Sequence, residues 1–99
     1  IPSTASKQHS LLVTFGTAQA ADTLLALQRD GAWALAYAPT IGYATLLVST
    51  PSIADGATYD VYIGGTATGT VANGIYNAPQ VAGGTLVASI TAASAKTTP

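Results

Sequence analysis

Short stretches in which every second residue is apolar recur along this chain, and they end at Gly, Pro, Asn or Asp. Such alternation places one set of side chains on a single face of an extended strand, whereas a helix would need a spacing of three and four. The pattern predicts six strands, which are Leu11–Phe15, Thr23–Gln28, Trp33–Tyr37, Thr45–Ser49, Thr58–Ile63 and Thr85–Thr91. A weaker strand is expected near Gly69–Ala72 or Ile75–Tyr76. Strands at intervals of about ten residues predict an all-β fold, a two-sheet antiparallel, Ig-like β-sandwich of about seven strands.

Two dipeptides predict tight hairpin turns. Asp30-Gly31 and Asn73-Gly74 combine residue types that tolerate the positive φ angles of two-residue hairpin loops. We expect Pro39, Pro51 and Pro79 between strands, because proline has no N–H to give to a sheet. The glycine pairs at 64–65 and 83–84 are interpreted as strand ends and bends, since no helix or Lys-Ser/Thr follows them as a phosphate loop requires.

The alternation also sorts side chains between the inside and the outside of the sandwich. The residues expected to fill the layer between the sheets are Leu11, Val13, Phe15, Trp33, Leu35, Tyr37, Tyr59, Val61, Ile63, Leu86, Ala88 and Ile90. The residues expected on the opposite faces are Leu12, Leu24 (or Leu25, depending on register), Leu47, Tyr62 and Val87. A free monomer would normally carry charged or amide groups there, so these apolar side chains are candidates for contacts between subunits.

Charge is scarce on this chain. Charged residues make up 7% of the sequence, against about a quarter in an ordinary soluble domain, while 48% of the residues are hydrophobic. We therefore expect part of the exterior to be covered by other copies of the chain, and the predicted assembly residues are Ile1, Leu12, Leu24, Leu47, Tyr62 and Val87. The net charge of −1 argues against nucleic acid as a partner. No apolar run approaches the roughly 20 residues of a membrane span.

The chain is divided into an arm, a body and a tail. Residues 1–10 are interpreted as an extended N-terminal arm, 11–91 as the β-sandwich domain and 92–99 as a Thr/Ala-rich tail. An arm of one subunit could complete the sheet of the next by adding a strand. The segments considered for that role are Ile1–Ser10 and Leu86–Ala92.

The residue types present in this chain give little support for a catalytic function. His9 is the only histidine, and cysteine and glutamate are absent. Ser10 or Ser49 could be combined with His9 and Asp55, but neither serine has the sequence context of an activated nucleophile. We expect no catalytic residues, no enzyme activity and no cofactor.

The aspartates are interpreted as structural. Asp30 and Asp55 each precede a glycine, which predicts carboxylates that cap turns by accepting backbone N–H groups. Calcium needs six to eight oxygen ligands, and the spaced carboxylates of a calcium loop are absent. Asp55 and Asp60 would be the first candidates as donors, but no metal site is predicted.

Aromatic side chains support an alternative function in carbohydrate binding. We expect Tyr43, Tyr62 and Tyr76 to be partly exposed, where planar rings could stack on sugar, whereas Trp33 and Tyr37 are expected in the core. Polysaccharide is therefore a candidate partner. Covalent O-glycans on the Ser/Thr-rich ends are another way to supply hydrophilic groups.

One long segment resembles a known family. It contains Ser49-Thr50-Pro51-Ser52-Ile53, Asp55-Gly56, Tyr59-Asp60-Val61-Tyr62, Gly64-Gly65-Thr66-Ala67-Thr68-Gly69, Gly74-Ile75-Tyr76 and Gly83-Gly84-Thr85. This segment resembles the C-terminal β-sandwich module of secreted bacterial carbohydrate-binding-domain-containing proteins. The resemblance implies an extracellular β module with a strand–turn–strand unit built on Pro51, Gly56, Tyr59 and Tyr62. In that family sugar binding belongs to a β-helical part outside this module, so no ligand residue is carried over.

The sequence thus favours a non-enzymatic structural subunit of an extracellular filament or surface assembly. Copies of the chain would be joined through apolar sheet faces and by strand donation. The absence of Cys and Met together with abundant Thr, Ala and Gly is in keeping with an exported protein. The alternative is a carbohydrate-binding or adhesion module of a secreted bacterial protein.

Overall fold

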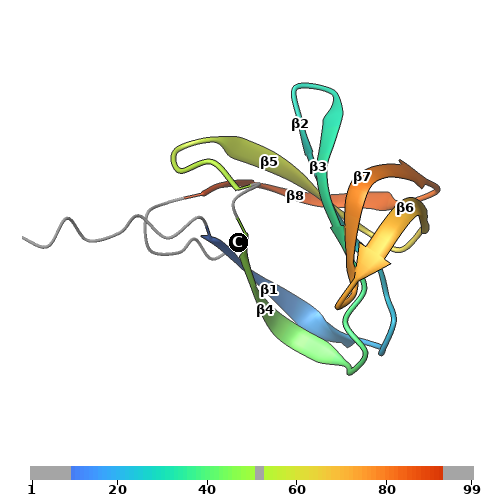
Figure 1. Cartoon of the computed structure of the whole chain (residues 1–99). Coiled ribbons are helices and arrows are strands. Elements are labelled where there is room, and N and C mark those ends of the chain that lie inside the picture. The colour runs from blue at the N-terminus through green and yellow to red at the C-terminus, as the bar shows by residue number, and fades with distance from the viewer. Residues whose placement is uncertain (1–9, 51–52, 93–99) are drawn as a thin grey trace, which may run out of the picture.

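The structure is a computed structural model that describes residues 10–50 and 53–92. These residues form eight strands and no helix (Figure 1). The strands are β1 (Ser10–Gln19), β2 (Leu25–Arg29), β3 (Ala32–Tyr37), β4 (Tyr43–Ser49), β5 (Thr58–Ile63), β6 (Thr66–Ala72), β7 (Ile75–Ala82) and β8 (Thr85–Thr91). The all-β, two-sheet antiparallel sandwich is confirmed, with eight strands where about seven were expected.

The two sheets differ greatly in size. β1 and β4 form a two-stranded ribbon, and the other strands form a six-stranded sheet in the order β6-β7-β3-β2-β5-β8. All strand pairs are antiparallel. In Figure 1 the ribbon lies on one side of the larger sheet. The main core fills the layer between them and is made of Leu11, Val13, Leu25, Leu27, Leu35, Val48, Ile53, Tyr59, Val61, Ile90 and Ala92.

Both hairpin turns predicted from the sequence are present. Asp30 and Gly31 have φ angles of 52° and 80° and connect β2 to β3, and Asn73 and Gly74 repeat these values between β6 and β7. Two successive residues with positive φ give the turn whose twist matches that of the flanking strands. The turn at Asn73-Gly74 joins β6 to β7. The sequence predicted one weak strand near either Gly69–Ala72 or Ile75–Tyr76, and both segments belong to paired strands.

Four glycines form a corner in the middle of one long hairpin, whose outgoing arm is β5 and β6 and whose returning arm is β7 and β8. β5 and β8 pair as far as Ile63 and Thr85, and β6 and β7 pair from Thr66 and Ala82 onward in the same register. The corner consists of Gly64, Gly65, Gly83 and Gly84, and the first three have φ angles of 82° to 84°. In the near half of the hairpin, made of β5 and β8, it is β5 that pairs with β2. In the far half, made of β6 and β7, it is β7 that pairs with β3. The long hairpin therefore wraps around the β2–β3 hairpin, and the interpretation of these glycines as bends is confirmed.

A second, smaller apolar cluster lies on the other face of the six-stranded sheet. Its buried members are Leu24, Ala26 and Ala36. The half-buried residues packed around them are Trp33, Ala38, Tyr62, Ala67, Tyr76 and Val81. The last four come from both halves of the bent hairpin. The bend therefore covers a face that the alternating sequence pattern predicted to be open.

Bulges move two predicted core residues to the other face. Leu27 pairs with Leu35 but Gln28 pairs with Trp33, which leaves one extra residue in β3. Trp33 is thereby placed in the second cluster and not in the main core. The same shift occurs in β8 at Val87, and it places Leu86 outside the core with 52% exposure. An extra residue reverses the side-chain alternation of a strand, so these two expectations were wrong.

The prolines are divided between a loop and a strand. Pro39 lies between β3 and β4 as expected, and Pro51 lies outside the described residues. Pro79, however, lies inside β7, at a bulge where residues 78 and 79 together oppose Gly69 of β6. A bulge leaves one residue outside the hydrogen-bond ladder, so a residue without an N–H is tolerated there.

The predicted boundaries of the domain need one change. Ser10, assigned to the arm, begins β1, and residues 1–9 lie outside the described part. Ala92, assigned to the tail, is fully buried in the main core. Its N–H donates to Ala57 O and its carbonyl accepts from Gly56 N. The sandwich therefore includes both residues.

We predict that alanine is tolerated much better at Gly64 than at Gly65. Both residues have φ near 80°, which costs a side chain about 1–2 kcal/mol. A Cβ at Gly64 meets nothing within 4 Å, but one at Gly65 would lie 2.6 Å from Ala82 O and from Gly84 N. Forcing these backbone segments apart adds about 1–3 kcal/mol, so Gly65→Ala is expected to lower the free energy of unfolding clearly more than Gly64→Ala. Denaturant unfolding measures both, and equal losses would contradict a tightly closed corner.

Candidate assembly surface

Four of the described strands lie at the edges of the two sheets. Within the described residues β1 and β4 pair only with each other, β6 pairs only with β7, and β8 pairs only with β5. An edge strand presents a row of N–H and C=O groups that can accept another strand. Soluble monomers usually protect such edges with lysine, proline or a bulge.

Charged side chains avoid all four edges. The charged residues of the described part are Asp22, Arg29, Asp30, Asp55 and Asp60. Three of them lie in loops or turns, and the other two lie in β2 and β5, the strands that pair with each other inside the larger sheet. The edge strands β1, β4, β6 and β8 contain no charged residue. The edges therefore lack the electrostatic protection that would keep subunits apart.

Large exposed apolar side chains gather on the same strands. Leu47 on β4 is 53% exposed, Val71 on β6 is 51% exposed, and Leu86 and Val87 on β8 are 52% and 49% exposed. The other exposed large apolar residue, Ile41, lies in the loop before β4. Exposed large apolar side chains thus lie on three of the four described edge strands, β4, β6 and β8.

The predicted assembly residues differ in whether the structure leaves their side chains exposed. Leu47 and Val87 are exposed as expected, and Leu12, which lies directly opposite Leu47 in the ribbon, is half-buried. Leu24 is only 5% exposed and belongs to the second cluster, so its assignment to an open face was wrong. Tyr62 packs in that cluster as well. Ile1 lies outside the described residues.

The three candidate sugar-stacking tyrosines do not share one surface. Tyr43 is 7% exposed, and its hydroxyl donates a hydrogen bond of 2.7 Å to Thr23 O, so the expectation of an exposed ring was wrong. Its ring packs edge-on against Phe15 with centroids 5.8 Å apart. Burial raises the pKa of the Tyr43 hydroxyl above its ordinary value of 10.0. Tyr43 is therefore a structural residue of the ribbon.

Tyr62 and Tyr76 lie together with Trp33 around the second cluster. The Trp33 and Tyr62 rings are 5.1 Å apart at an interplanar angle of 71°, an edge-to-face arrangement that offers no common plane to a sugar ring. The Tyr62 hydroxyl donates to Gln28 Oε1 over 3.3 Å. The sequence pattern missed Trp33 as a member of this face because the bulge in β3 has no signature in the alternation.

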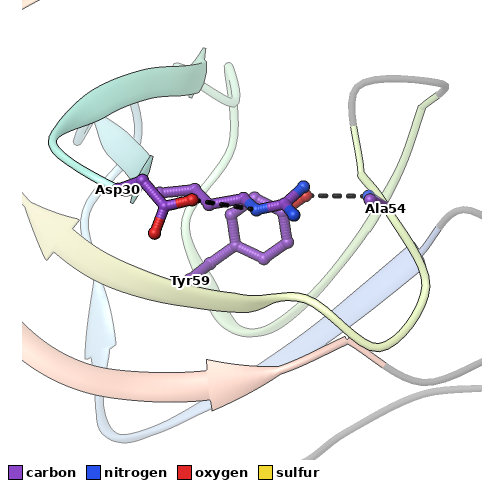
Figure 2. Close-up of polar contacts among 4 residues, drawn as sticks. Asp30, Ala54 and Tyr59 are labelled. Carbon is purple, nitrogen blue, oxygen red and sulfur yellow. Dashed lines mark hydrogen bonds and ion pairs between the residues drawn. The ribbon is translucent and has the colours of Figure 1, made fainter.

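The turn aspartates do not act as predicted. The Asp30 side chain is 91% exposed, and its Oδ2 forms an ion pair with Arg29 Nε at 3.7 Å (Figure 2). The Asp55 carboxylate oxygens are buried and have no hydrogen-bond partner among residues 10–50 and 53–92, so they cap no turn there. That turn is held by the backbone bond from Ala57 N to Ala54 O and by Tyr59, whose hydroxyl accepts the Ala54 N–H at 2.8 Å (Figure 2).

The residues weighed for catalysis and metal binding are dispersed. Ser10 is fully buried and Ser49 lies opposite it in the ribbon, whereas His9 is outside the described residues. Asp60 Oδ1 accepts a 2.6 Å hydrogen bond from the Ser89 hydroxyl. In the ranges 10–50 and 53–92, no three His, Cys, Asp or Glu residues lie together as potential metal ligands. The same ranges hold no helix that could cross a bilayer.

Comparison with known proteins gave no relatives. No family model matches the chain, and searches of curated proteins and of solved structures found no significant match. The resemblance of the 49–85 segment to a secreted bacterial module therefore stays a prediction.

We predict that Tyr43 makes the fold sensitive to alkali. Because burial raises the folded-state pKa of Tyr43, its stabilising contribution is complete below the unfolded value of 10.0 and is lost as the pH rises through the folded value. The free energy of unfolding should fall as the pH rises above about 10, and Tyr43→Phe should flatten this slope. The variant also loses the bond to Thr23 O at every pH, so the slope and not the absolute stability is the readout. An unchanged slope would contradict the assignment.

Proposed function

We propose that this protein is a non-enzymatic structural subunit of an extracellular filament or surface assembly, built from copies of itself. The observation that supports the proposal is that β4, β6 and β8, which are edge strands within residues 10–50 and 53–92, carry no charged residue and carry exposed large apolar side chains. Edge pairing would supply backbone hydrogen bonds, and each apolar side chain buried in the contact would add on the order of 1.5–3 kcal/mol.

The observed strand pairing argues against one of the two candidate segments for strand donation. The segment Leu86–Ala92, one of the two candidates for donation, is occupied within its own sheet, where β8 pairs with β5 from Thr58–Thr91 to Ile63–Thr85. Donating it to a neighbour would break that pairing and remove Ile90 from the core. Donation by the arm stays a prediction, because residues 1–9 lie outside the described part.

The carbohydrate-binding alternative has less support. Tyr43 is buried, and Tyr62 meets Trp33 edge-on. Sugar binding by aromatic platforms needs flat, accessible rings. Trp33, Tyr62 and Tyr76 do lie around one cluster, but all three are half-buried, and the Trp33 and Tyr62 rings meet at 71°. Polysaccharide and covalent glycans are therefore treated as alternatives that the experiment below must separate from self-assembly.

The test is the assembly state of the purified chain, with glycan-free material verified by intact mass. We expect sedimentation velocity to show a concentration-dependent shift to large species, and negative-stain microscopy to show elongated assemblies. Adding soluble polysaccharide should leave this behaviour unchanged. A monodisperse monomer at millimolar concentration without attached glycans would refute the proposal, and polymer formation only in the presence of polysaccharide would favour the alternative.

A further inference from the structure

A buried carboxylate lies in the turn that precedes β5. Both oxygens of the Asp55 side chain are buried, and neither has a hydrogen-bond partner among residues 10–50 and 53–92. A carboxylate that is removed from water loses its hydration, so buried carboxylates in proteins are normally paired with a cation or with hydrogen-bond donors. Within the described residues, Asp55 lacks the partner that its burial requires.

The backbone on both sides of Asp55 is held by hydrogen bonds. The Ala54 N–H donates to the Tyr59 hydroxyl at 2.8 Å (Figure 2). The Ala57 N–H donates to Ala54 O at 3.2 Å and closes the turn, in which Gly56 has a φ angle of 82°. These bonds hold the carboxylate in its buried position. A partner therefore has to be brought to it.

The described residues contain one basic side chain, and it does not fill this role. Arg29 forms its ion pair with Asp30 at 3.7 Å, its side chain is 47% exposed, and it makes no hydrogen bond to Asp55. The other basic residues of the chain are Lys7 and Lys96, and both lie outside the described residues. A cation for Asp55 within the same chain has to come from one of these two lysines.

The C-terminal segment starts directly beside the turn. The carbonyl of Ala92, the last described residue, accepts the Gly56 N–H, and the Ala92 N–H donates to Ala57 O. Lys96 follows four residues later, a distance of about 13–14 Å along a fully extended chain. Because Gly56 is the chain neighbour of Asp55, a segment of this length can fold back and bring the lysine ammonium to the carboxylate.

We propose that the Lys96 ammonium pairs with the Asp55 carboxylate of the same chain and holds the C-terminal segment against this end of the sandwich. Lys7 is the less suitable cation, because it precedes Ser10, which begins β1 in the two-stranded ribbon and pairs with Ser49. The contact lies within one chain, so the inference does not depend on the proposed function. A segment held in this way is not available as an added strand for a neighbouring copy.

Trypsin tests the contact. The protease must bind the lysine side chain before it cleaves, so an ammonium held by Asp55 is protected. The chain has three tryptic sites, Lys7, Arg29 and Lys96, and intact mass identifies each cut. We expect cleavage after Lys96 to be about tenfold or more faster in Asp55→Asn than in the unmodified chain, with cleavage after Lys7 unchanged. Asp30→Asn is the matched control, because it removes the same charge from a side chain that is 91% exposed.

The sign of a stability change gives an independent readout. Without a cation at the site, Asp55→Asn would remove an unpaired buried charge and raise the denaturant midpoint of unfolding. With Lys96 bound, Asp55→Asn and Lys96→Gln should each lower the midpoint. The double variant should unfold at a higher midpoint than Lys96→Gln, because asparagine removes the charge that glutamine leaves unpaired. Lys96→Arg should keep the midpoint of the unmodified chain, and Lys7→Gln should not change it.

Four results would overturn the inference. Equal rates of cleavage after Lys96 with and without Asp55→Asn would mean that the carboxylate does not hold this lysine. Faster cleavage after Lys7 in Asp55→Asn would assign the role to Lys7. A higher midpoint for Asp55→Asn would mean that no cation reaches the carboxylate. Protection of Lys96 that appears only at concentrations where the chain assembles would assign the lysine to a neighbouring copy.

The inference and the proposed function fail separately. A chain that stays monomeric but protects Lys96 through Asp55 would support the contact and overturn the assembly. A chain that assembles with Lys96 freely cleaved would support the assembly and overturn the contact.

Discussion

The closed corner between Gly64-Gly65 and Gly83-Gly84 determines the arrangement of the larger sheet. A Cβ at Gly65 would lie 2.6 Å from backbone atoms of the opposite segment, which shows how closely the two chain segments approach there. Three positive φ angles turn both segments together, so their register on the far side is the same as on the near side. Without this turn the hairpin would continue straight past β2. With it, one half pairs with β2 and the other half with β3.

The corner has two further consequences. It closes over the outer face of the β2–β3 hairpin, where Leu24, Ala26 and Ala36 are buried. It also places the two outer segments of the same hairpin, β6 and β8, at opposite ends of one sheet. The sandwich thus gains a second apolar cluster that stabilises the bent hairpin, and the bend sets β6 and β8 at the two ends of the described strand order. One local turn therefore both buries the second cluster and determines which strands end the described sheet.

The sequence predicts the local features of this fold well and its long-range features poorly. The turns at Asp30-Gly31 and Asn73-Gly74 follow from residue chemistry alone, and they have the expected positive φ angles. Leu11, Val13 and Val61 face the core because alternation is a property of a single strand. Trp33 and Leu86 were misplaced because a bulge is defined by the partner strand, and nothing in their own segments marks the extra residue.

The same distinction applies to the candidate assembly surface. Composition predicts an exterior that is poor in charge, but it does not say which strands form the edges. That information comes from the wrapping of the long hairpin, and it changes the interpretation of several residues. Leu24 becomes a core residue because the bend covers it, whereas Val71, in a segment that alternation marked only weakly, becomes one of the most exposed apolar side chains. Tyr43 is buried through Phe15 and Thr23, contacts that its own segment does not encode.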